Sequence, residues 1–176
     1  MPQTIIPRPG AGEHDPYYGR YISRVEGDDA LAALITQIGG TMRLLERAGE
    51  ARALHRYAPD KWSVKQVIGH VSDSERVFAY RALRFARGDR TPLPGFDETL
   101  YVPEGRFDDR PLADLALELR AVRAASIALF AALGPEALAR TGTANDTPMS
   151  VRALAWTIAG HELHHRGLLI ERYGLT

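Results

Sequence analysis

The chain has 176 residues with 22 basic and 22 acidic side chains, so its formal net charge at pH 7 is zero. Hydrophobic residues make up 45% and charged residues 25% of it, which is typical of a folded globular protein and excludes a disordered chain. The absence of a basic excess argues against a nucleic-acid partner, and the absence of cysteine excludes disulfides, thiolate metal ligands and a cysteine nucleophile.

The segment from Met1 to Gly12 lacks the charged part and the long apolar run of a signal peptide. Residues 1–27 contain four prolines, several glycines and the tyrosines Tyr17, Tyr18 and Tyr21. This composition predicts an extended arm that lies over the domain and is anchored by its aromatic residues. No part of the chain approaches the roughly 18 consecutive apolar residues of a membrane span. We therefore expect a cytoplasmic protein without a membrane partner.

A first helix is predicted over residues 28–48. Asp28 or Asp29 is a suitable cap, and the apolar residues that follow recur at the i, i+3, i+4 spacing of an amphipathic helix. Gly39 and Gly40 inside this helix should each cost about 1 kcal/mol relative to alanine. Close approach of another helix is one way to compensate that cost.

A second helix is predicted over residues 63–88, where the start signal is the clearest in the chain. Ser63 and Gln66 have the spacing of a capping box, and Gly88 is a natural stop. Residues 89–110 then form a long connection with three prolines and three aromatic residues. A loop of this length is often functional, and it can run the full length of a helix, which would make the second and third helices parallel.

The third helix is predicted over residues 111–134, where apolar residues alternate spacings of three and four as in a heptad seam. In a bundle of four helices such a seam serves the core by default. After a short turn of helix and a polar loop, a fourth helix is predicted over residues 150–173, capped by Thr147 or Ser150. No strand is expected, so the predicted fold is all-α, with residues 1–176 forming one four-helix-bundle domain.

The motif His161-Glu162-Leu163-His164-His165 is the strongest functional signal. Side chains at i and i+4 lie one above the other on a helix, so His161 and His165 can both reach one metal ion. Both also continue the apolar stripe of the fourth helix, where neutral imidazoles without partners are costly. The alternative is a pair of core histidines hydrogen-bonded to backbone or carboxylate groups.

His70 is the natural third ligand, because it lies at the edge of the buried stripe of the second helix. Helix bundles build their metal sites from side chains on facing helices. Three histidines leave coordination positions open, whereas structural sites usually have four protein ligands. One divalent transition metal ion is therefore expected, with zinc and nickel as first candidates and manganese and iron(II) also compatible.

Candidates for an acid or base near the metal are weaker. Glu75 and Asp73 lie within a turn of His70 and would act as hydrogen-bond acceptors for the ligands or as a general base. The residues 161–165 also match H-E-x-x-H, in which Glu162 would be the general base of a zinc protease. Only 11 residues follow His165, which leaves little room for the third ligand that such proteases usually place downstream.

These motifs resemble a known family. Trp62-Ser63-Val64 leading to Gly69-His70-Val71, together with residues 161–167, is similar to the DinB/YfiT-like superfamily. The resemblance implies a four-helix bundle, commonly a homodimer, in which His70, His161 and His165 are the metal ligands. It also implies that some relatives act with low-molecular-weight thiols.

We therefore expect a metal-dependent enzyme that activates water or a low-molecular-weight thiol against a small-molecule substrate, as a hydrolase or a thiol S-transferase. A bundle that binds a metal or a ligand without turnover is the alternative, and a zinc protease is a remote third. No residue in the sequence identifies the substrate.

Overall fold

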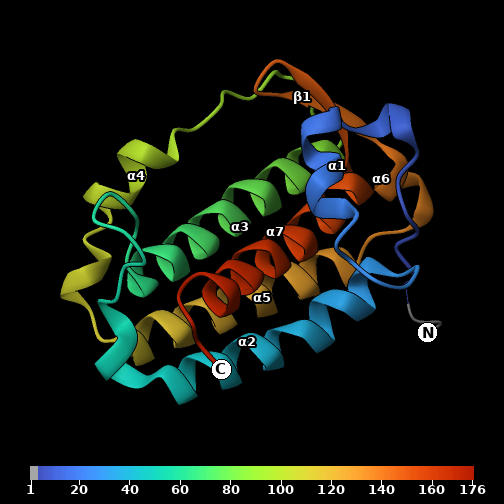
Figure 1. The fold of residues 1–176 in the computed structure, drawn as a ribbon. Coiled ribbons are helices and arrows are strands. Elements are labelled where there is room, and N and C mark those ends of the chain that lie inside the picture. Colours follow the sequence, from blue (N-terminus) through green and yellow to red (C-terminus); the bar gives the residue numbers. More distant parts are fainter. Residues whose placement is uncertain (1–3) are drawn as a thin grey trace.

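The computed structural model describes residues 4–176 and confirms the predicted bundle (Figure 1). Its four long helices are α2 (Ala30–Ala53), α3 (Val64–Ala86), α5 (Leu112–Ala131) and α7 (Val151–Glu171). The helices α3 and α5 run parallel and α2 and α7 run in the opposite direction, so the segment between α3 and α5 returns along the length of the bundle. Among the described residues, no helix has both the length and the apolar character needed to cross a bilayer.

The helix starts agree with the capping signals. Asp29 accepts a hydrogen bond from the backbone of Leu31, Ser63 and Gln66 form the reciprocal capping box, and Ser150 caps α7. The helix α2 reaches Ala53, but its backbone is non-helical at Gly49, where a positive φ of 57° places a kink between the regular helix and a last short turn.

A small β-hairpin differs from the prediction of an all-helical chain. Residues Thr141–Ala144 (β1) and Thr147–Ser150 (β2) form a two-stranded antiparallel hairpin. Its two-residue turn has positive φ at both Asn145 and Asp146, which is the geometry that matches the twist of paired strands. The strands escape prediction because they are short and carry small polar residues, glycine and proline in place of alternating apolar ones.

The two segments expected to be irregular also contain helices. The N-terminal arm forms a 3-10 turn η1 (Ala11–Glu13) and the helix α1 (Pro16–Ile22), and its residues 1–3 lie outside the described range. The crossover contains α4 (Glu98–Glu104) and the 3-10 turn η2 (Phe107–Asp109). Both segments therefore cover the bundle with folded elements.

A buried tryptophan fixes the start of the arm. Trp156 of α7 is fully buried, and its indole N–H donates to the backbone carbonyls of Ile6 and Pro7 at 3.1 and 3.0 Å. Tyr18 and Tyr21 of α1 are buried as predicted for anchors, whereas Tyr17 is half exposed. The arm is thus held against α7 along its length.

The core of the bundle has two apolar clusters. One surrounds Phe85 and Trp156, and the other surrounds Ile68 and Leu115. On each of the four long helices, buried polar residues lie between the segments that enter the two clusters or next to that boundary. This polar belt contains Thr41, His70, Ser72, Ser74, Glu75, Arg123, Ser126, Thr157, His161, Glu162 and His165. Because burying polar groups costs free energy, this polar belt in the middle of the bundle is a candidate functional site.

Two glycines let covering segments reach the belt. A Cβ atom at Gly160 would overlap with the backbone carbonyl of Tyr21 in α1, and one at Gly69 would overlap with the ring of Phe107 in η2. Each glycine directly precedes a predicted metal ligand. By contrast, Gly40 faces only the end of the Arg166 side chain, so no helix backbone packs against the Gly39–Gly40 pair.

Replacing Gly160 with alanine is expected to lower the free energy of unfolding by roughly 1–3 kcal/mol, because the backbone of α1 must move away from α7. Equilibrium urea unfolding measures the loss. Gly167→Ala on the same helix is the control, since the nearest atom to its new Cβ lies 4.0 Å away, and we expect it to stabilise by up to about 1 kcal/mol. Equal effects of the two substitutions would show that the contact between α1 and α7 has no special role.

Candidate metal centre

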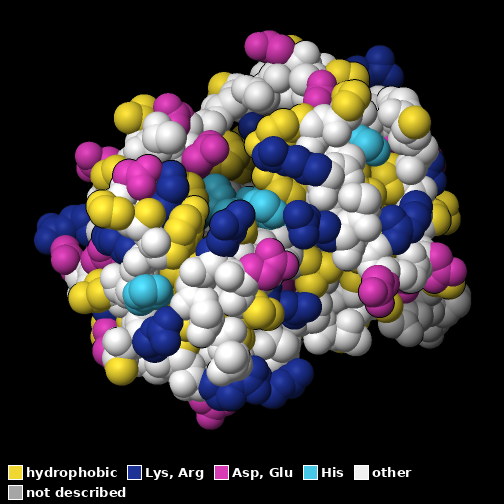
Figure 2. Space-filling view, in the orientation of Figure 1, with side chains coloured by type: hydrophobic (Ala, Val, Ile, Leu, Met, Phe, Trp, Pro, Cys, Tyr) yellow, Lys and Arg dark blue, Asp and Glu magenta, His cyan; other side chains and the backbone are white. Residues whose placement is uncertain are grey.

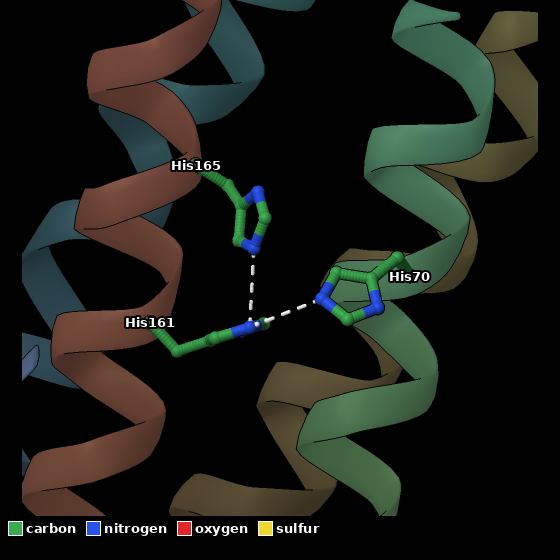
Figure 3. Close-up of side chains that lie close together, drawn as sticks. All are labelled: His70, His161 and His165. Atoms are coloured by element: carbon green, nitrogen blue, oxygen red, sulfur yellow. Dashed lines mark hydrogen bonds between the residues drawn. The ribbon is translucent and has the colours of Figure 1, made fainter. Parts of the chain in front are cut away.

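The three predicted ligands meet in the polar belt. His161 and His165 extend from successive turns of α7, and His70 reaches them from α3 across the bundle (Figure 3). The Nε2 atom of His161 lies 3.2 Å from Nε2 of His70 and 3.1 Å from Nε2 of His165. Among the described residues, this is the group of histidine and acidic side chains with ligand atoms close enough to share one metal ion.

The spacing of the nitrogens fits a metal site. Ligand nitrogens at 2.0–2.1 Å from a tetrahedral ion lie about 3.3 Å from one another. Hydrogen bonding alone accounts poorly for the cluster, because Nε2 of His161 has either one proton or one lone pair and faces two other ring nitrogens. A cation at the shared point would satisfy all three lone pairs together.

All three rings are held in the form that binds metals. Burial lowers the pKa of His70 to about 4, with a smaller contribution from His164. Burial, followed by repulsion from neighbouring imidazoles, lowers the pKa values of His161 and His165 well below their usual range. The rings are therefore neutral at pH 7, so no proton must leave before they bind a cation.

Aromatic rings enclose the cluster. Trp62 packs at 4.8 Å from His70, while Tyr21 and Phe78 pack at 5.2 and 6.0 Å from His161. His164 packs against Tyr21 and does not join the three ligands. Within residues 4–176, Nδ1 of His165 is buried without a hydrogen-bond partner. The rings are thus oriented mainly by packing.

Two of the acidic residues predicted as a general acid or base, Glu75 and Glu162, bind to a buried arginine. Arg123 of α5 is 1% exposed and donates to both carboxylate oxygens of Glu75 at 2.9 Å and to Glu162 at 2.7 Å. Glu162 also accepts hydrogen bonds from Gln37 and Thr41 of α2.

Both carboxylates are therefore occupied in an ion-pair network that ties the four long helices together. This placement argues against Glu75 and Glu162 as general bases, and with them against the H-E-x-x-H protease. Asp73 forms an ion pair with Arg76, and none of these carboxylates bonds to a ligand histidine.

A pocket of about 250 Å³ opens onto the histidine cluster. Its lining includes His70 and His161, the three tyrosines Tyr17, Tyr18 and Tyr21 of α1, and Phe96 and Glu98 of the crossover. Figure 2 shows histidine side chains at the bottom of a hollow on this face of the molecule. The arm and the crossover thus supply much of the pocket wall.

Comparison with models of protein families identifies the superfamily of this chain. The sequence model of the DinB superfamily matches residues 33–169, which include all three histidines. The chain belongs to the DinB superfamily. The resemblance inferred from the histidine motifs is therefore confirmed.

Two solved structures are similar to this chain in fold. YfiT from Bacillus subtilis, described as a probable metal-dependent hydrolase with an unusual four-helix bundle topology, matches with a TM-score of 0.71 and 16% identity over 96% of this chain and 94% of that chain. A DinB-like protein from the same organism, YjoA, matches with a TM-score of 0.59 and 19% identity over 82% of this chain and 89% of that chain. At these identities the matches establish the fold alone. The comparison with curated proteins gave no match.

Proposed function

We propose that this DinB-superfamily protein is a metal-dependent hydrolase of small molecules. One divalent transition metal ion, zinc or nickel in the first place and manganese or iron(II) as alternatives, would bind to Nε2 of His70, His161 and His165. The observation that carries the proposal is that Nε2 of His161 lies within hydrogen-bond distance of Nε2 of both His70 and His165, and that His70 and His161 line a pocket.

The residues around the pocket would have different roles in the reaction. The three neutral imidazoles supply three ligand nitrogens, a number that leaves room for one more ligand from the pocket. Burial raises the pKa of Tyr21 to about 12, so its hydroxyl keeps its proton at the pocket wall at neutral pH. Phe78 and Phe96 make part of the wall apolar and limit the water around the reacting groups. A bound divalent ion would lower the pKa of a water molecule or a thiol and so provide a nucleophile at neutral pH.

Hydrolysis is preferred over thiol transfer because YfiT, which shares the fold, is described as a probable metal-dependent hydrolase. Transfer of a low-molecular-weight thiol would use the same centre. The homodimer implied by the family resemblance stays a prediction.

Turnover by the purified protein tests the proposal. We expect hydrolysis of activated esters or amides without added thiol after reconstitution with zinc or nickel, at least about 100-fold above the same protein stripped with a chelator. His164→Ala is the matched control, because it removes a histidine that neighbours the centre but lies outside the three ligands. It should keep the activity.

The other outcomes assign the protein to the alternatives. Turnover of a chlorinated or epoxide substrate only when thiol is present would replace hydrolysis by thiol transfer. A fully metal-loaded protein that turns over neither class would be a metal-binding bundle without catalysis.

A further inference from the structure

The pocket above the metal centre contains a buried guanidinium without a carboxylate partner. Arg81 of α3 is 2% exposed and lines the pocket together with His70 and His161. Within residues 4–176 it forms no ion pair, and its one hydrogen bond is a donation to the backbone carbonyl of Pro94 at 2.9 Å. Every other buried arginine or lysine in this range, Arg123 and Lys65, is paired with a glutamate.

The remaining neighbours of Arg81 compensate its charge only in part. The guanidinium carbon lies 5.9 Å from the ring centres of both Phe78 and Phe96. Tyr18 lines the same pocket, and the Arg81 guanidinium offsets part of the rise that burial causes in the pKa of Tyr18. Aromatic faces and a single carbonyl leave most of the five N–H donors of an arginine free, and burying such a group without an anion is costly.

A second buried donor lies between Arg81 and the histidines. Ser74 is 1% exposed and lines the same pocket, and its hydroxyl has no hydrogen-bond partner among the described residues. Residues 70, 74, 78 and 81 follow one another along one face of α3, because a helix repeats every 3.6 residues. The pocket therefore has a metal centre at one end, a hydroxyl in the middle and a cation at the other end.

The distance between the Arg81 guanidinium and the histidine cluster limits the length of a ligand that can contact both. The side chain of Arg81 reaches toward the start of its helix, as helical side chains do, and lies 5.9 Å from the Phe78 ring. That ring lies 6.0 Å from the His161 ring, so the guanidinium and the His161 ring are at most about 12 Å apart, the sum of the two distances. The pocket volume of about 250 Å³ lies just below the usual range for drug-sized ligands, which favours a small molecule.

The geometry points to a small organic monocarboxylate as the substrate class. Its carboxylate would bind to Arg81, a polar atom in its middle to Ser74, and its reacting carbonyl would lie at the three histidines. This assignment rests on the proposed function for the reaction, but the binding of the carboxylate does not require turnover. A monoanion fits better than a phosphate dianion, because Arg81 is the only cation among the lining residues and Asp15 and Glu98 lie on the same pocket.

Titration of the metal-loaded protein with benzoate and with its neutral counterpart benzamide tests the inference. We expect benzoate to bind at least about 10-fold more tightly, which is typical for a charge-assisted hydrogen bond to arginine. Arg81→Met should remove this difference and Arg81→Lys should retain part of it, because lysine keeps the charge but loses the planar fork. Arg172→Met is the control at an exposed arginine outside the pocket and should bind benzoate as the wild type does.

Nuclear magnetic resonance locates the ligand, since the side-chain N–H signal of Arg81 should shift with benzoate and not with benzamide. Equal affinities of the two compounds for the wild type would overturn the inference even if Arg81→Met fails to fold. Unchanged benzoate affinity in both Arg81 variants would also overturn it, as the carboxylate would then bind at the metal alone. Tighter binding of inorganic phosphate than of benzoate at Arg81 would replace the carboxylate class. The titration includes no catalytic step, so a protein without turnover can still show the expected preference for benzoate.

Discussion

Replacement of His161 by alanine is expected to reduce the metal content from about one equivalent per chain to almost none. The Nε2 atom of His161 is the one that lies next to both other ligand nitrogens, so its loss leaves His70 and His165 as a pair. Loss of a residue that only supports a ligand typically weakens metal affinity 10–100-fold, so loss of a ligand should weaken it by more than about 100-fold. Elemental analysis of untagged protein measures the content directly.

The control for this experiment is His164→Ala. His164 is half-buried and contacts Tyr21, but it does not belong to the three convergent histidines. It should retain one equivalent of metal. Wild-type protein that is isolated without metal and also fails to take up zinc or nickel would contradict the metal centre and leave three core histidines in its place.

The histidine cluster was predictable because two independent patterns agree. The i, i+4 spacing puts His161 and His165 on one face of a helix, and the apolar stripe of that helix directs this face into the core. His70 required only that a neighbouring buried stripe contain another histidine. Capping residues such as Ser63 and Ser150 are equally local signals, so the long helices were predictable too.

The features that sequence patterns missed depend on long-range partners. Arg123 lies in the helix predicted over residues 111–134, and an arginine in an amphipathic helix is normally assigned to the solvent side. Its burial is favourable only because Glu75 and Glu162 reach it from two other helices. The spacing of Leu119, Arg123 and Ser126 along one face was the available signal. The role of Gly160 likewise depends on α1, a helix within the segment predicted to be extended.

Substitution of Arg123 by methionine is expected to lower the free energy of unfolding by roughly 3–5 kcal/mol, because it leaves two buried carboxylates without their cation. Urea or thermal unfolding of the metal-free protein measures this loss without interference from metal binding. Arg120→Met on the same helix is the matched control. Arg120 is exposed and forms no ion pair within residues 4–176, so its replacement should change stability by no more than about 0.5 kcal/mol.

Neutralising both acids in the same background separates charge from packing. The triple variant Arg123→Met, Glu75→Gln, Glu162→Gln contains no buried charge at this point, so we expect it to recover most of the stability that Arg123→Met loses. Recovery would identify the unpaired carboxylates as the cause of the loss. It would also show that Glu162 contributes to the framework of the bundle, and the triple variant should still bind metal through His161 and its two partners. A cost of Arg123→Met no larger than that of Arg120→Met would contradict the network as a source of stability.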